Sequence, residues 1–517
     1  MLAVINQLHT WYQQHPLKAI LWVGFFFRLL AVFFAKGYGW HDDQFLVVEI
    51  AQSWVDGIDF YGWLPSDNGT NEPEGFSFFY VGIHYILLWT MKWLGMINPE
   101  TKMLVIRLFH AVWSMLIIYF GYQITLRLSS VREAKIVGWL LAIFWIFPFI
   151  SVRNLVEYVS IPFLMAGLWM VVKAGKKDLR FSWWFLAGII LGLAFNVRFQ
   201  TLIITGGIGL ALLFQKQWRQ TIFMALGVLS SMVVVQGILD YSVWGIPFVQ
   251  VTGYVDYNMH HAAEYVVSPW YTYLLFLSGI LIPPVSLFLL FGYFRNWRRL
   301  LILFLPILIF LIFHSYYPNK QERFVVTIIP FLMISGVIGW MQLQQAWQNN
   351  KAITRWIKRS WIFFWIINFI LLIPVTLMYS KKARVESMIY LSQYADLQHF
   401  LIEDVNQSVL RFPPQYYLKH WIRYDTFMRE DTLSTYAREI QHGGAVPDFV
   451  LFYQPDQLEP RIKTMKTLFP DLVYETTIEP GFMDEVLFWL NPINDNQIIT
   501  IYRNNGTISK SIPSAHE

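Results

Sequence analysis

The feature that most constrains this fold is a series of apolar runs, each close to the length that crosses a lipid bilayer. Residues 274–294 and 300–313 are two examples, the second short but almost wholly apolar. A helix needs about 20 such residues to cross the hydrocarbon core. Only 14% of the residues are charged, whereas a soluble domain has about 25%. The runs predict a polytopic helical membrane protein, because a membrane barrel would show segments of about 10 alternating residues.

The loops between the apolar runs alternate in charge, and this alternation predicts the topology. Eleven spanning helices are expected, at residues 17–36, 104–126, 135–150, 157–173, 182–196, 200–214, 221–239, 271–292, 300–315, 324–342 and 360–379. One set of loops is basic, namely 127–135, 173–180, 215–219, 295–299 and 351–359. The other set is longer or carries acids, namely 37–102, 151–157, 240–270 and 316–323. The positive-inside bias places the basic set in the cytoplasm and the other set outside.

Two further segments complete the predicted organisation. Residues 76–95 are apolar enough to span, but a span here would invert the charge alternation, so we predict a helix lying in the interface. After residue 380 charged residues become frequent. The β-like runs 449–453, 472–477 and 497–502 then alternate with helical patterns such as 385–400. The expected domains are a membrane core, 1–380, whose first outer loop 37–102 carries the acids, and a small extracytoplasmic α/β domain, 381–517.

Composition and motif searches exclude several classes of function. The chain has no cysteine, which rules out disulfides, thiolate catalysis and cysteine-ligated metals. The net charge of +5 does not indicate nucleic-acid binding, because the basic residues concentrate in short loops. No phosphate-binding glycine loop and no dinucleotide fingerprint appears, so a nucleotide sugar is not the expected donor. The histidines have no zinc-binding spacing. We therefore expect no cofactor, no metal and no nucleic-acid partner.

Adjacent carboxylates follow the first apolar run, where charge is costly and ionisable residues are candidates for function. Asp42 and Asp43 come first, and Glu49 lies seven residues after Asp42, which on an α-helix would place both on one face. One aspartate is a candidate general base. The alternative is a helix N-cap with a first-turn acid, which would contribute about 1 kcal/mol. Both hold together if Asp42 caps the helix while Asp43 points elsewhere.

Cations near other outer loops are candidates for binding a phosphate. Arg153 either pairs with Glu157, four residues later, or reaches a phosphate. Arg198 lies alone between two apolar helices and is either a phosphate ligand or a snorkelling arginine. In the loop 317–324, Lys320 and Arg323 would cradle a lipid phosphate, unless the loop is simply solvated.

The outer loop 240–270 is aromatic and polar. It contains Tyr257, Asn258 and Trp270. Such side chains would stack on a sugar ring or anchor the chain at the membrane interface, where Trp and Tyr normally gather.

These motifs, in this order, resemble glycosyltransferase family 22, the lipid-phosphate-mannose-dependent mannosyltransferases. The family's H-P-D-E motif and a later glutamate resemble the stretch with Asp42, Asp43 and Glu49, although the His-Pro is not matched. Its R-T-L-S-N-S-x-E segment resembles residues 153–157, with the arginine and leucine retained. Its H-K-E-E-R-F motif resembles Asn319-Lys320-Gln321-Glu322-Arg323-Phe324, and its aromatic loop resembles residues 240–273. The resemblance covers roughly residues 17–345.

The resemblance implies a GT-C fold and an inverting transfer of a sugar, expected to be mannose, from a polyprenyl-phosphate donor to a glycan or glycolipid acceptor. Asp42 is then the expected base, with Asp43 and Glu49 beside it. The donor phosphate would be bound by Lys320, Arg323, Arg198 and Arg153. The sugar or acceptor would be bound by Glu157, Tyr257, Asn258, Trp270 and Glu322. The expected location is a bacterial inner membrane with the site facing the periplasm, or the endoplasmic reticulum membrane of a eukaryote.

The competing prediction is a transporter or flippase of a lipid-linked saccharide. Such a protein would have charges near the midplane, broken helices and two corresponding halves. Here the ionisable residues gather in loops at one face, and the two halves show no symmetry. A non-catalytic scaffold is the third alternative, and it requires the Asp42 region to be dispensable.

Overall fold

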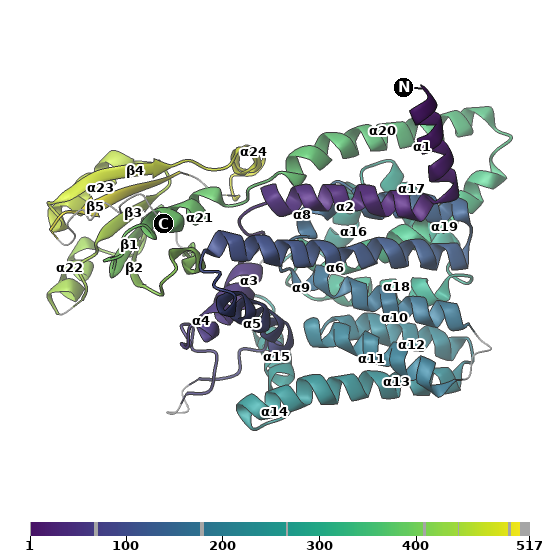
Figure 1. Ribbon diagram of the computed structural model, residues 1–517, viewed down its shortest axis with the longest axis horizontal. Helices are drawn as coiled ribbons and strands as arrows, with labels where there is room; N and C mark the ends of the chain where they lie inside the picture. Colours follow the sequence, from purple (N-terminus) through teal and green to yellow (C-terminus); the bar gives the residue numbers. More distant parts are fainter. Residues whose placement is uncertain are drawn as a thin grey trace. The chain divides into compact units, whose positions relative to one another are not determined.

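The computed structural model describes residues 2–66, 71–175, 180–264, 267–406, 410–442, 444–494 and 498–506 (Figure 1). Parts of the predicted loops 37–102, 173–180 and 240–270, and Gln497 of the last predicted strand, lie outside these ranges. The chain forms two compact units. The first contains residues 1–33, 61–86 and 106–377, and the second contains 34–60, 87–105 and 378–517. The units interleave along the chain, whereas the sequence placed one boundary at residue 380.

The first unit is helical. Its helices are α1 (Leu2–Gln14), α2 (Pro16–Phe34), α6 (Pro99–Leu128), α7 (Val131–Ile143), α8 (Phe147–Ile150), α9 (Val156–Val159), α10 (Ile161–Ala174), α11 (Phe181–Val197), α12 (Thr201–Phe214), α13 (Trp218–Ser231), η2 (Met232–Gly237), α14 (Ile238–Trp244), α15 (Val249–His260), α16 (Thr272–Ile280), α17 (Val285–Arg295), α18 (Leu301–Tyr316), η3 (Glu322–Ile328), α19 (Ile329–Ala346) and α20 (Lys351–Thr376). Helix α5 (Phe78–Trp93) begins in this unit, and α6 begins in the other.

Several of these helices are long and apolar enough to cross a membrane. In the described part of the chain six reach this length, at Pro16–Phe34, Pro99–Leu128, Val156–Ala174, Trp218–Trp244, Glu322–Ala346 and Lys351–Thr376. Four shorter apolar helices accompany them, at Phe181–Val197, Thr201–Phe214, Val285–Arg295 and Leu301–Tyr316. Figure 1 shows α10, α11, α12 and α13 running alongside one another. The apolar runs of the sequence thus appear as helices of a bundle.

The core of the bundle is the segment Glu322–Ala346, whose most apolar window is completely buried. It packs on α17 at a crossing of glycines. A Cβ atom on Gly339 would lie 1.9 Å from the carbonyl oxygen of Gly292, a distance that no side chain tolerates. Small residues at such crossings let two helix backbones approach closely, which replaces the hydrophobic driving force that is missing within a membrane. The η3 turn at the start of this segment carries Arg323 into the buried part of the unit.

Several predicted elements differ from the structure, among them the helix expected at 135–150, which is interrupted between Ile143 and Phe147. The single helix expected at 271–292 is wrong, because α16 ends at Ile280 and α17 begins at Val285. Pro283 and Pro284 lie between them, and a proline in a helix interior removes a hydrogen bond and clashes with the preceding turn. The helix expected at 385–400 ends at Leu391, since residues from His399 form a strand. Helix α1, before the first span, was not predicted.

The second unit contains a five-stranded sheet. Its elements are α3 (His41–Asp43), η1 (Gln44–Glu49), α4 (Ile50–Val55), α21 (Lys382–Leu391), β1 (His399–Asp404), η4 (Gln415–Leu418), β2 (Arg423–Met428), α22 (Leu433–Gln441), β3 (Phe449–Tyr453), α23 (Leu458–Leu468), β4 (Leu472–Ile478), α24 (Phe482–Leu490) and β5 (Ile499–Asn504). The strand order is β2-β1-β3-β5-β4. Strands β1, β2 and β3 are parallel, and β5 is antiparallel to both β3 and β4.

The first outer segment is joined to the C-terminal part of the chain inside this second unit. Ser380 N donates to the Lys36 carbonyl oxygen at 3.2 Å, and Lys381 Nζ donates to the Gly39 carbonyl oxygen at 2.8 Å. Gly37 has φ of +71°, and a Cβ there would lie 1.9 Å from the Ser380 carbonyl oxygen. Both the left-handed backbone and the close contact require glycine. The segment with the predicted acids is thereby fixed to the α/β domain.

Candidate active site

The predicted acids lie on a helical segment that contains a π turn. Helix α3, η1 and α4 follow one another without interruption, and η1 is π-helical over Gln44–Glu49. In a π-helix the backbone hydrogen bonds join residues five apart. Accordingly, Gln44 Nε2 donates to Glu49 Oε1 at 3.2 Å. The prediction that Asp42 and Glu49 share a face relied on α-helical spacing and is wrong, since Asp42 is half-buried whereas Glu49 is completely buried.

Asp43, rather than Asp42, has the capping role. Its two carboxylate oxygens accept hydrogen bonds from Gly39 N and Trp40 N, both at 3.0 Å. The Asp43 side chain is buried, with 2% of its surface exposed. A carboxylate at a helix start stabilises the backbone N–H groups that lack a partner within the helix. The sequence suggested the opposite assignment. Asp42 lies beside Asp43 in the first turn of the helix.

Glu49 lies in the interior of the second unit. Its Oε1 atom also accepts a hydrogen bond from Tyr416 N at 3.3 Å. Burial, with a smaller contribution from the Glu49 charge, raises the pKa of Tyr424 to about 12. Glu49 thus joins the acid segment to the loop that contains η4, and this contact fits a positioning role better than a contact with substrate.

A second group of predicted residues meets in the first unit. Arg198 Nη2 lies 3.1 Å from Glu157 Oε1, and Arg323 Nε lies 3.9 Å from the same oxygen. The three residues come from α9, from the end of α11 and from η3. All are at least nine-tenths buried. The interpretation of Arg198 as a snorkelling arginine is wrong, because its charge is paired inside the protein. We call Glu157, Arg198 and Arg323 the guanidinium cluster.

The guanidinium cluster contains more positive than negative charge. Two guanidinium groups share the one carboxylate of Glu157. Within the described residues, the buried Nε atom of Arg198 has no hydrogen-bond partner. A buried charge is costly unless it is paired, and an anion placed between these guanidinium groups would add to the pairing that Glu157 provides. The cluster is suited to hold a phosphate, because guanidinium groups present donors in a planar fork.

One residue of this site was missed by sequence reasoning. Tyr254 on α15 lies beneath Arg198, whose guanidinium carbon is 6.0 Å from the ring centroid. Burial raises the pKa of Tyr254, while the charge of Arg198 opposes this shift. Tyr254 lies one turn before Tyr257 on α15, so helical spacing from Tyr257 is the sequence signal that points to it.

Two predicted phosphate ligands, Arg153 and Lys320, are also buried. Arg153 precedes α9 and Lys320 precedes η3. The Arg153 guanidinium lies 4.3 Å from the centroid of the Phe149 ring. Lys320 Nζ donates to the Tyr317 carbonyl oxygen at 2.6 Å, and burial lowers the pKa of this lysine. Glu157 pairs with guanidinium groups from other elements, Arg198 and Arg323, which the i,i+4 alternative did not anticipate.

The remaining predicted residues lie at the surface of the first unit. Glu322 is exposed, although the neighbouring Arg323 is buried. Trp270 has 66% of its surface exposed and Tyr257 has 44%. The ring of Tyr257 stacks on His261, with centroids 4.4 Å apart, and the Tyr317 hydroxyl donates to the Asn258 carbonyl oxygen. Among the described residues, no group of three His, Asp or Glu side chains is placed to hold a metal ion.

Comparison with known proteins identifies the family. Residues 19–418, well over half of the chain, match the model of the Alg9-like mannosyltransferase family. The chain belongs to this family. A search of curated protein sequences gives no match. The Alg9-like family model includes both the acid segment and the guanidinium cluster, and it extends into the loop that contains η4.

Solved structures show the fold of this Alg9-like protein. ArnT from Cupriavidus metallidurans, bound to undecaprenyl phosphate, has a TM-score of 0.62 at 14% identity, covering 96% of this chain and 98% of ArnT. The AglB oligosaccharyltransferase from Archaeoglobus fulgidus, in complex with an inhibitory peptide and a dolichol-phosphate, has a TM-score of 0.54 at 12% identity. That match covers 91% of this chain and 74% of AglB. At these identities the likeness establishes the fold.

The predicted family, fold class and enzyme class are confirmed. The protein is a glycosyltransferase with a GT-C fold, a mostly helical integral membrane protein with a small C-terminal sheet domain.

Proposed function

We propose that this Alg9-like protein transfers a sugar, mannose, from a polyprenyl-phosphate donor to a glycan or glycolipid acceptor, with inversion at the anomeric carbon. The guanidinium cluster is the observation that carries the proposal. A buried site with two guanidinium groups around one carboxylate is suited to an anion, and the donor's phosphate is an anion delivered from the membrane. The solved ArnT and AglB structures contain undecaprenyl phosphate and a dolichol-phosphate respectively. These lipids support a polyprenyl phosphate as the donor class.

The guanidinium cluster acts on the leaving group. When the bond between the sugar C1 and the phosphate oxygen breaks, a phosphate diester becomes a monoester and gains negative charge. Arg198 and Arg323 are preorganised donors for that charge, and such electrostatic stabilisation is commonly the largest single contribution to catalysis. Lys320 and Arg153 add positive charge to the donor site. Glu157 holds the two guanidinium groups in place.

Asp42 acts on the nucleophile. An acceptor hydroxyl attacks C1 from the face opposite the phosphate, the new oxygen–carbon bond forms, and the hydroxyl proton passes to an Asp42 carboxylate oxygen. A positioned general base contributes roughly 10²–10⁴-fold. Capping by Asp43 and the π turn ending at Glu49 fix the backbone that presents Asp42. We assign the surface residues Tyr257, Asn258, Trp270 and Glu322 to the sugar or acceptor.

The loops that carry these residues belong to the set without the basic bias, so the proposed site faces away from the cytoplasm. In a bacterium this is the periplasmic side of the inner membrane. In a eukaryote it is the lumen of the endoplasmic reticulum.

The test measures transfer of radiolabelled mannose from synthetic polyprenyl-phosphate-mannose by the purified full chain in detergent. The variant is Asp42→Asn, and the matched control is Asp256→Asn, at an exposed carboxylate on α15. Wild type and the control are expected to transfer, with Asp42→Asn reduced at least a hundredfold and folded by thermal unfolding. EDTA is expected to change nothing.

Two results would contradict parts of this proposal. Near-normal transfer by Asp42→Asn removes the general-base assignment. A wild-type protein that moves no sugar from any polyprenyl-phosphate donor, yet carries the labelled lipid across vesicle bilayers, is a flippase.

A further inference from the structure

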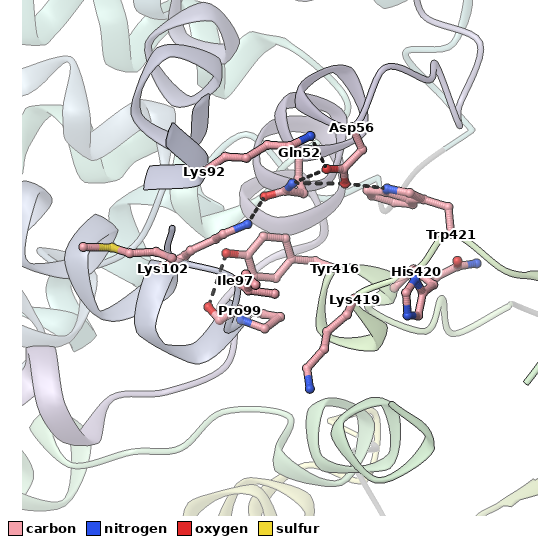
Figure 2. A pocket seen from close by; sticks show the side chains of 12 residues that line it. Gln52, Asp56, Lys92, Ile97, Pro99, Lys102, Tyr416, Lys419, His420 and Trp421 are labelled. Carbon is pink, nitrogen blue, oxygen red and sulfur yellow. Dashed lines mark hydrogen bonds and ion pairs between the residues drawn. The ribbon is translucent and has the colours of Figure 1, made fainter. Parts of the chain in front are cut away.

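A pocket in the second unit contains none of the residues assigned above to the donor, the base or the acceptor. It is formed by α4, the end of α5, the start of α6, η4 and the loop after η4 (Figure 2). Its lining includes three lysines and one histidine, Lys92, Lys102, Lys419 and His420. It includes one carboxylate, Asp56. The side chains of Trp421 and Tyr416 supply aromatic walls.

The carboxylate in this pocket is already occupied. Asp56 accepts hydrogen bonds from Gln52 Nε2 and from Trp421 Nε1, each at 3.0 Å. Lys92 Nζ lies 3.5 Å from Asp56 Oδ1 and donates to the Val55 carbonyl oxygen at 2.9 Å. Figure 2 shows these contacts converging on Asp56. Asp56 is therefore bonded directly to Gln52 and Trp421 and paired with Lys92, and its charge acts on Lys102 without a direct contact.

Lys102 is the buried cation of the pocket. Only 7% of its surface is exposed. In the described part of the chain, the side-chain partner of its ammonium is the neutral amide oxygen Oε1 of Gln52, at 3.2 Å. An ammonium has three N–H donors, and its burial without a directly bonded carboxylate is costly. A bound anion would remove this cost.

The rim of the pocket indicates what kind of molecule carries the anion. Ile97 lines the pocket and has 76% of its surface exposed, and the neighbouring Trp93 and Leu94 are exposed to 77% and 58%. These apolar side chains form the turn between α5 and α6, and α6 is long and apolar enough to span a membrane. A cationic pocket beside an exposed apolar turn matches a molecule with a charged head and an apolar chain.

We propose that this pocket binds the phosphate of a lipid, with the phosphate oxygens on Lys102 and the apolar chain over Trp93, Leu94 and Ile97. Three lysines and a histidine suit a phosphate. The lipid is either an anionic phospholipid of the bilayer or a polyprenyl phosphate, and the chemistry recognised is the same for both. The binding does not depend on the proposed transfer reaction.

The test measures lipid binding to the delipidated full chain by native mass spectrometry. The probes are phosphatidylglycerol, phosphatidylcholine, undecaprenyl phosphate and inorganic phosphate. Lys102→Met removes the buried charge with little change in volume. If Lys102→Met does not fold, Lys92→Met serves as the test variant in its place. Lys463→Met, at an exposed lysine on α23, is the matched control.

Wild type and the Lys463→Met control are expected to retain one anionic lipid that Lys102→Met binds about tenfold more weakly, the loss expected for one charged hydrogen bond. The anionic lipid whose binding falls in Lys102→Met, phosphatidylglycerol or undecaprenyl phosphate, identifies the source. Equal binding by Lys102→Met, Lys92→Met and wild type overturns the proposal. Inorganic phosphate binding as tightly as the lipids overturns the assignment to a lipid.

A different observation concerns α24. Four of its apolar residues recur at helical spacing and are exposed: Phe482 73%, Trp489 80%, Leu490 64% and, just after the helix, Ile493 88%. Its buried residue is Asp484, whose carboxylate accepts from Lys381 N and Lys382 N, both at 3.1 Å. These two backbone groups lie only a few residues after α20 ends at Thr376, and α20 is long and apolar enough to span a membrane.

We infer that the apolar face of α24 rests on the lipid surface. The helix is attached to a chain segment that has just left a spanning helix, so a bilayer surface is the apolar partner within reach. An amphipathic helix with an exposed tryptophan is suited to the interface between lipid and water.

The absence of cysteine from the chain makes a direct test possible. A spin label is attached to Trp489→Cys, and in the control to Ser434→Cys on α22, with the full chain in lipid nanodiscs. We expect the spin label at Trp489→Cys to collide more often with oxygen, which dissolves in lipid, than with a water-soluble nickel reagent. At Ser434→Cys we expect the reverse. The same preference at both positions overturns the inference.

Discussion

At the scale of single residues, the guanidinium cluster shows how this glycosyltransferase keeps charge inside an apolar bundle. Glu157 lies between Arg198 and Arg323, so each guanidinium has a partner, and these three residues carry two positive charges and one negative charge. A site in this state is poised to take up an anion, and its response to substitution depends on the geometry of the donors as well as on their charge.

The first prediction concerns that geometry. Arg198→Lys keeps the positive charge but loses the planar fork that a phosphate engages through two donors. We expect mannose transfer to fall at least tenfold. The control is Arg355→Lys, at an exposed position of α20. Undiminished transfer by Arg198→Lys would show that point charge alone is sufficient at this position.

The second prediction concerns pH. Burial lowers the pKa of Lys320, so this lysine loses its proton at a lower pH than an ordinary lysine, whose pKa is about 10.4. If its charge assists the phosphate, transfer falls on the alkaline side before that pH is reached. Lys320→Arg stays charged and should move the alkaline limb upward. A pH profile of transfer that is identical for the two proteins would separate Lys320 from the reaction.

At the scale of elements, the crossing of α17 and α19 is the most demanding contact in the bundle. We predict that Gly339→Ala destabilises the protein, because its Cβ would lie 1.9 Å from the Gly292 carbonyl oxygen and the helices would have to separate. Gly206→Ala on α12 is the matched control, since nothing lies within 4 Å of its added Cβ. Thermal unfolding in detergent should show a lower Tm for Gly339→Ala alone. Equal Tm values would mean that the crossing relaxes at no cost.

The elements also show what the sequence allows a reader to predict. Apolar length and loop charge located most of the helices, because membrane spans are a strong, local signal. The π turn of η1 left no such signal, and α-helical spacing therefore misplaced Glu49 relative to Asp42. Likewise, the pairing of Glu157 with Arg198 joins residues from different helices, which no local spacing encodes. In contrast, the pair Pro283-Pro284 does indicate the break between α16 and α17, although a single helix was predicted at 271–292.

At the scale of the whole molecule, the second unit is assembled from three separate stretches of chain. Residues 378–517 expressed alone are therefore predicted not to fold stably, since Glu49, Gly37 and the start of α6 all contribute contacts to that unit. The measurement is limited proteolysis. Rapid digestion of the fragment is expected, whereas the same region of the full chain should resist. A resistant fragment would show that residues 34–60 and 87–105 are dispensable for the domain.

The contact between Glu49 and Tyr416 N joins residues that are far apart in the order of synthesis. At translation rates of about 5–20 residues per second, the ribosome reaches Tyr416 roughly 20–70 s after Glu49. During that interval the acid segment lacks the loop that completes its packing. A nascent chain therefore forms the contact between Glu49 and Tyr416 only late in synthesis. A chain truncated before Tyr416 lacks this contact, and its acid segment is not fully packed.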